Sequence, residues 1–144
     1  MKNKKEQKKD RKYQRPDFLD KLIDQQIYEK WLNRKARGHF NRDKKHDSIQ
    51  STCQEYKKAI HEAVYDSNGL DAYTGKDMKW ELLATFDRVR IADLPTVDHV
   101  RDAKKQPSFK ICSWRVNDAK SDLTLDEFVS LCGVIIKFYE KSKN

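Results

Sequence analysis

The sequence predicts an α+β domain, with a helical N-terminal region over 17–69 and two strands and a long helix over 70–144. Three observations lead to this fold class. Apolar residues recur at helical spacing in the first half of the chain and again near its end. Two short apolar runs, 94–100 and 109–114, are joined by a polar link, which is typical of strands. A chain of 144 residues accommodates one such domain together with a tail.

The first sixteen residues are a basic arm. Residues 1–15 carry eight Lys and Arg against Glu6 and Asp10, a net charge of +6, whereas the rest of the chain carries 23 basic and 21 acidic groups. Such a polar segment buries too little apolar surface to fold, so we expect residues 1–16 to be disordered. The arm either contacts phosphates or keeps the protein in solution, and its charge is compatible with both roles.

Composition excludes several classes of protein. No apolar stretch of a secretion signal follows the basic arm, and no segment approaches the roughly 20 apolar residues of a membrane span. We therefore expect a cytoplasmic protein without membrane contact. The three cysteines, Cys53, Cys112 and Cys132, form no paired motif, which argues against disulfides and a structural zinc ion. We expect all three to pack in the core.

Two helices are predicted in the N-terminal region. The first covers 17–37, and a polar, basic loop follows over 39–47. The second begins with the capping-box pattern of Thr52 and Glu55 and ends at Asn68-Gly69. The three histidines of this region are expected in the loop or on the helix surface, without a metal-binding role: His39, His46 and His61.

The last helix has the clearest pattern in the chain. A second capping box, Thr124 with Glu127, opens it, and it should run to about Lys141. Its apolar positions form a wide face, so we expect most of its length to be buried. These positions are Leu125, Phe128, Val129, Leu131, Cys132, Ile135, Ile136 and Tyr139.

The candidate catalytic and metal-binding residues follow the two predicted strands. Asp98 and His99 stand at the end of the first, and Asn117 follows the second. Carboxylate and amide oxygens are the hard ligands that suit Mg²⁺ or Mn²⁺. An imidazole with a pKa near 6.5 can deprotonate water at neutral pH. This combination is suited to metal-assisted hydrolysis of a phosphodiester.

The same residues resemble the ββα-metal core of the HNH endonucleases over roughly 70–132. The resemblance is carried by Pro95-Thr96-Val97-Asp98-His99-Val100, by Phe109-Lys110-Ile111-Cys112-Ser113-Trp114 and by Asn117-Asp118-Ala119-Lys120. It implies a DNA endonuclease that uses one Mg²⁺ or Mn²⁺ ion and leaves a 5′ phosphate.

The resemblance also implies roles for single residues. Asp98 and Asn117 would hold the metal, and His99 would be the general base. Lys120 would hold the start of its helix or touch a phosphate. The family's middle Asn, which supports the loop that carries the His, aligns with Ser108, whose hydroxyl supports less well than an amide.

Further basic residues flank the expected site: Arg101, Lys104, Lys105 and Arg115. We expect them, with Lys120, to contact phosphates, although such charges also occur on an ordinary solvated rim. The alternative to a nuclease is an HNH-like module that binds nucleic acid or protein without catalysis. The chain could also work as a subunit of a larger assembly. The apolar faces of the first and last helices are compatible with a homodimer and equally with internal packing.

Overall fold

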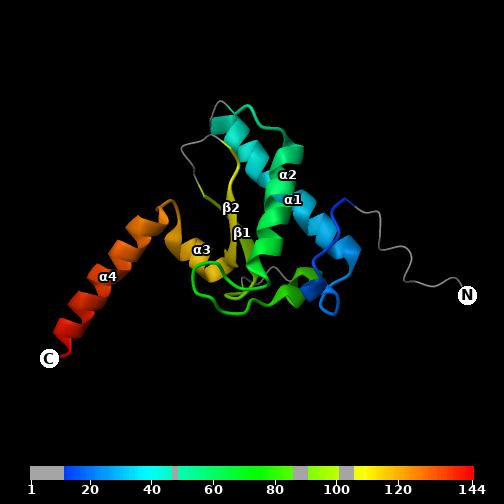
Figure 1. The fold of residues 1–144 in the computed structure, drawn as a ribbon. Helices are drawn as coiled ribbons and strands as arrows, with labels where there is room; N and C mark the ends of the chain where they lie inside the picture. The colour runs from blue at the N-terminus through cyan, green and yellow to red at the C-terminus, as the bar shows by residue number, and fades with distance from the viewer. Residues whose placement is uncertain (1–11, 47–48, 86–90, 101–105) are drawn as a thin grey trace, which may run out of the picture.

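The computed structural model describes residues 12–46, 49–85, 91–100 and 106–144, and it has an α+β fold (Figure 1). Helices α1 and α2 lie side by side and contact a two-stranded antiparallel sheet, from which α3 continues directly. The elements are a 3₁₀ helix (Asp17–Leu19), α1 (Gln25–His46), α2 (Cys53–Ser67), a second 3₁₀ helix (Trp80–Ala84), β1 (Pro95–His99), β2 (Phe109–Ser113), α3 (Trp114–Lys120) and α4 (Leu125–Ser142).

Helix α1 begins and ends later than predicted. The carboxylate of Asp24 accepts the N–H of Ile27 at 2.8 Å and so caps the helix well beyond the predicted start at residue 17. The predicted loop over 39–47 is wrong, because the helix passes through Gly38 and continues to His46. A glycine inside a helix costs about 1 kcal/mol. The next residue, His39, is buried against the sheet, where its Nε2 atom lies 3.2 Å from the Val97 carbonyl.

Helix α2 has the predicted boundaries. The Thr52 hydroxyl accepts the N–H of Glu55, and the Glu55 carboxylate accepts the N–H of Thr52, which confirms the capping box. At the other end Asn68 and Gly69 adopt positive φ angles of 47° and 87°. A Cβ at Gly69 would lie 3.4 Å from the ring of Phe18, so both conformation and packing favour glycine there.

The core lies between α1, α2 and the sheet. Trp31 and Trp80 are both buried in the core and meet edge to face with ring centroids 5.9 Å apart. His61, predicted on the surface, is half-buried, and its Nδ1 lies 2.7 Å from the Tyr28 hydroxyl. Other buried apolar residues are Leu19, Ile23, Leu32, Tyr56, Ile60, Val64, Met78, Val97, Phe109 and Ile111.

The two predicted strands are present, and they pair with Asp98 opposite Lys110 and His99 opposite Phe109. Asp71 ties the preceding turn to this sheet. Its buried carboxylate accepts the N–H of Ser113 at 2.8 Å and the N–H of Tyr73 at 2.8 Å. These bonds fix the position of Tyr73 relative to the sheet.

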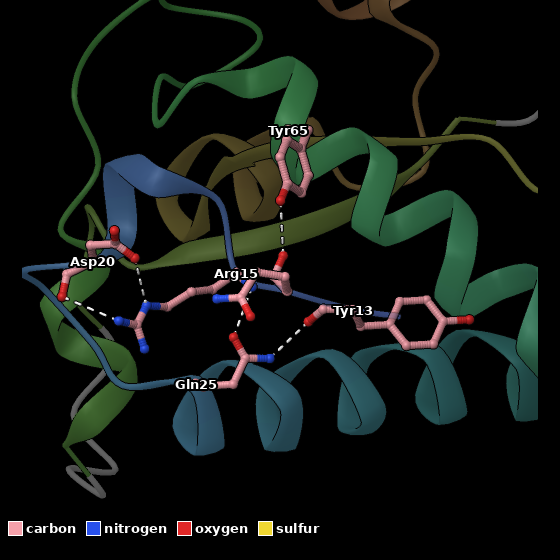
Figure 2. A network of polar contacts seen from close by, with 6 residues as sticks. Tyr13, Arg15, Asp20, Gln25 and Tyr65 are labelled. Atoms are coloured by element: carbon pink, nitrogen blue, oxygen red, sulfur yellow. Dashed lines mark hydrogen bonds and ion pairs between the residues drawn. The ribbon is translucent and has the colours of Figure 1, made fainter. Parts of the chain in front are cut away.

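The end of the predicted N-terminal arm is ordered. Gln25 donates to the Tyr13 carbonyl and accepts the Arg15 N–H, each at 2.8 Å, while the Arg15 guanidinium pairs with Asp20 at 3.2 Å (Figure 2). Tyr65 of α2 donates to the Gln14 carbonyl at 3.0 Å. The packed part of the chain thus includes residues 12–16, ahead of the start predicted at residue 17. Residues 1–11 lie outside the described residues.

Helix α4 has the predicted cap but not the predicted burial. The Thr124–Glu127 capping box is present, and the helix ends at Ser142, one residue past the predicted end. No residue of α4 is buried, so the expectation of a packed helix is wrong. Ser121, with a φ of 51°, turns the chain after α3, and α4 points away from the rest of the molecule (Figure 1).

None of the described helices, α4 included, is long and apolar enough to cross a membrane. The cysteines occupy different environments. Cys112 is buried in β2, Cys53 packs against the core, and Cys132 is partly exposed on α4, where core packing was expected.

Candidate active site

A cavity of about 840 Å³ opens between α1, β1, α3 and the start of α4. It brings together four residues that sequence reasoning selected, namely Asp98, His99, Asn117 and Lys120. Its volume lies in the range of small-ligand and substrate sites. The lining residues come from four separate elements, so the tertiary fold assembles this site.

Asp98 lines the cavity and is buried. Its Oδ2 atom lies 3.0 Å from Nζ of Lys120 and accepts the Tyr73 hydroxyl at 2.5 Å. Burial, followed by the bond to Asp98, raises the pKa of Tyr73 well above its usual value, so this phenol stays a donor. The Oδ1 atom has no hydrogen-bond partner among the described residues.

His99 is held by residues from both N-terminal helices. Its Nδ1 lies 3.4 Å from Oδ2 of Asp43 on α1, and that carboxylate accepts the hydroxyl of Tyr56 on α2 at 2.5 Å. The imidazole also stacks on Phe109, with centroids 5.1 Å apart. In the neutral tautomer that carries its proton on Nδ1, the nitrogen beside Asp43, the Nε2 atom has a lone pair for a proton from another molecule.

Alternation along a strand sends Asp98 and His99 to opposite faces, yet both line one cavity. They do so because His99 is the last residue of β1 and the free edge of that strand faces α1. His39 of α1 lies with Nε2 3.2 Å from the Val97 carbonyl, and Lys35 donates to the Thr96 hydroxyl at 3.0 Å. Helix α1 thus covers the edge of β1 and forms the facing wall of the cavity.

His39 is a buried structural residue, although the sequence places it in a loop. Arg42 donates to its Nδ1 at 3.1 Å, so Nε2 carries the proton that bonds to Val97. Burial, followed by the charges of Arg42, His99 and Lys35, lowers the pKa of His39 to about 4. The imidazole is therefore neutral at neutral pH and holds α1 against the strand.

The wall formed by α1 is cationic, which sequence reasoning did not foresee. Arg34, Lys35, Arg42 and His46 line the cavity, and α1 as a whole carries seven Lys and Arg against two acidic residues. Burial, followed by the charges of Arg34 and Arg42, lowers the pKa of Lys35 to about 8. A concentration of positive charge on one wall favours an anionic ligand.

The basic residues selected from the sequence have different positions. Lys120 lines the cavity, but its ammonium group is buried against Asp98. Arg115 is exposed and is not part of the cavity lining, because it precedes Asn117 on α3 by half a turn. Arg101, Lys104 and Lys105 lie outside the described residues.

Ser108 acts through its backbone. Its carbonyl accepts the N–H of Val100 at 2.9 Å and extends the β1–β2 pairing by one bond. Its hydroxyl has no hydrogen-bond partner among the described residues, so it does not brace His99 as the family's Asn would. The bracing comes from Asp43 and Tyr56 instead.

Asp98 and Asn117 carry carboxylate and amide oxygens, which are the donor types that Mg²⁺ and Mn²⁺ prefer. Both residues line the cavity, and such ions keep several water ligands when they bind proteins. Within the described part of the chain no three His, Cys, Asp or Glu side chains converge on a metal position.

Sequence reasoning gave no site role to three residues that contact Asp98 or support His99: Asp43, Tyr56 and Tyr73. Asp43 stands among basic residues in what looks like a loop, and Tyr56 looks like an ordinary member of an apolar stripe. Comparison of the chain with models of known protein families, with curated proteins and with solved structures finds no match.

Proposed function

We propose that the protein is a metal-dependent endonuclease that hydrolyses phosphodiester bonds of DNA. The observation that carries this proposal is the single cavity in which Asp98, His99 and Asn117 meet a cationic wall. A general base, oxygen ligands for a divalent ion and positive charge for phosphates are the groups that this hydrolysis needs.

In this proposal His99 is the general base. Its Nε2 atom accepts a proton from the attacking water, and the resulting imidazolium is stabilised by Asp43 at Nδ1. Tyr56 holds the Asp43 carboxylate in place through the bond to Oδ2. A bound Mg²⁺ or Mn²⁺ would supply Lewis-acid stabilisation of the scissile phosphate.

Asp98 and Asn117 would hold the ion. Lys120 and Tyr73 both bind Oδ2 of Asp98, so they orient the carboxylate and leave Oδ1 as its ligand atom. Lys120 is accordingly a positioning residue in this proposal and does not contact the substrate phosphate.

The cationic wall supports a polyanionic substrate. Arg34 and Arg42 lie on α1 at the cavity, and the adjoining surface of the same helix carries Lys30, Arg34 and Arg37. A chain of phosphates can therefore follow α1 into the cavity and place one phosphodiester near His99. Contacts of this kind bind DNA without reading its sequence.

One observation favours a second candidate, a catalytically silent binding module. Asp98 is already neutralised by Lys120, which weakens its attraction for a cation. In that case the cationic wall binds nucleic acid, and the Asp98–Lys120 pair is purely structural.

The two candidates are separated by incubating supercoiled plasmid with the protein in Mg²⁺, Mn²⁺ or EDTA. We expect metal-dependent nicking or linearisation that is lost in His99→Ala and kept in Asp66→Asn, which changes an exposed side chain of α2 outside the cavity lining. Plasmid binding without cleavage under any of these conditions would support the binding module. Cleavage that persists in His99→Ala would exclude His99 as the base.

A further inference from the structure

Helix α4 exposes an unusually large apolar face. Eight of its large apolar side chains are between 44% and 75% exposed, and the helix projects from the rest of the molecule (Figure 1). They are Leu125, Val129, Leu131, Val134, Ile135, Ile136, Phe138 and Tyr139. Together they present on the order of several hundred Å² of apolar surface, compared with the ~800 Å² that each partner contributes to a stable interface.

The spacing of the apolar residues indicates what covers them. Leu125, Phe128, Cys132, Ile135 and Tyr139 follow one another at alternating intervals of three and four residues. This is the seam of a coiled coil, in which helices of similar length pack along one face. Further apolar residues flank the seam and widen the contact. Val129 and Ile136 lie on one side of it, and Leu131 and Phe138 lie on the other.

We propose that α4 pairs with α4 of a second copy of this chain in antiparallel orientation. Charge supports this direction: the first turn carries Asp126 and Glu127, whereas the other end carries Lys137, Lys141 and Lys143 against a single acidic residue, Glu140. Antiparallel pairing sets the acidic end of one helix beside the basic end of its partner, and parallel pairing would set like charges together.

The register follows from the seam. With the twofold axis between Gly133 and Val134, Cys132 faces Ile135 of the other copy, and Phe128 faces Tyr139. The flanking residues also meet apolar partners, Val129 beside Ile136 and Leu131 beside Phe138. The seam layers from Phe128 to Tyr139 are thus matched by apolar residues, and Leu125 lies opposite Ser142 of the other copy.

The part of the molecule formed by α1, α2, α3 and the sheet, here called the body, also favours antiparallel pairing through its position. The body of the molecule adjoins the N-terminal end of α4, which is roughly 27 Å long at 1.5 Å per residue. Antiparallel pairing places the two bodies at opposite ends of the helix pair, whereas parallel pairing would crowd them at one end. The pairing does not depend on the proposed nuclease activity.

The mass of the full chain in solution tests the pairing. We expect sedimentation equilibrium to give a dimer, twice the 17.1 kDa of the chain. Ile135→Glu places a charge in the centre of the seam and should give a monomer with an unchanged near-ultraviolet spectrum of the body. Ser130→Glu, on the exposed polar side of the same helix, should remain a dimer.

Disulfide trapping tests the direction. In a Cys132→Ser background, Leu125→Cys and Ser142→Cys chains are mixed, allowed to exchange and mildly oxidised. Antiparallel pairing gives a covalent dimer in the mixture and none from Leu125→Cys alone, and the reverse result would overturn the proposed direction. A wild-type chain that stays monomeric at high micromolar concentration, or an Ile135→Glu variant that stays dimeric, would overturn the pairing itself.

Discussion

Asp98 and Lys120 form a buried ion pair in which the Lys120 Nζ atom lies 3.0 Å from Asp98 Oδ2, with less than a tenth of either side chain exposed. The pair joins β1 to α3 directly beside the proposed reaction centre. Removing one partner of such a pair leaves a buried charge without compensation, which costs more than the intact pair contributes.

Lys120→Met should therefore destabilise the protein by roughly 3–5 kcal/mol. Unfolding in urea, followed by fluorescence, measures this change. Arg115→Met removes an exposed cation from the same helix and should stay within about 0.5 kcal/mol of the wild type. The double variant Asp98→Asn with Lys120→Met should recover part of the stability, because the uncompensated charge is gone. A Lys120→Met protein as stable as the wild type would contradict a buried pair.

Asp43→Asn should lower kcat for plasmid cleavage by roughly 10–100-fold with little change in KM, because it weakens the support of His99 without touching the substrate. Tyr56→Phe should show a smaller decrease of the same kind. The ¹⁵N chemical shifts of His99 should show a smaller population of the Nδ1-protonated form in Asp43→Asn.

Asp66→Asn, a change of an exposed carboxylate on α2, is the matched control and should leave kcat and the His99 shifts unchanged. If Asp43→Asn lowered kcat while those shifts remained as in the wild type, Asp43 would act by some means other than orienting His99.

Stability should fall on acidification because His39 is buried in its neutral form. Its pKa is about 4 in the folded protein and near 6.5 when unfolded, so the unfolded chain binds the proton first as the pH falls between these values. The contribution is fully present above pH 6.5, and about 2 kcal/mol of it should be lost by pH 5. The measurement is urea unfolding of wild type and His39→Gln at both pH values. A pH dependence as steep in His39→Gln as in the wild type would exclude His39 as its source.

Arg34→Gln combined with Arg37→Gln should weaken DNA binding and reduce the slope of log K against log salt by about 0.9 for each phosphate that the variant no longer neutralises. Fluorescence anisotropy with a labelled duplex, over a series of salt concentrations, measures both effects. Lys57→Gln with Lys58→Gln removes the same charge from α2 and should leave the salt slope unchanged. Equal effects of the two double variants would mean that net charge, not the face of α1, sets the affinity.

The elements that the sequence predicted correctly depend on neighbouring residues. The Thr52–Glu55 and Thr124–Glu127 caps each join residues three positions apart, and the β1 and β2 runs are visible as short apolar segments. The order of Asp98, His99 and Asn117 along these elements was sufficient to place all three at one cavity.

The remaining features arise only in the folded molecule, because they depend on contacts between distant parts of the chain. Lys35 reaches Thr96 across 61 residues, and contacts of this kind extend α1 past Gly38 against the edge of β1. The same packing brings Asp43 to His99, which no local pattern could indicate. The residue pattern alone established that α4 is an amphipathic helix. Whether a helix buries its apolar face depends on what surface lies opposite it, and in this fold none of the described residues covers α4.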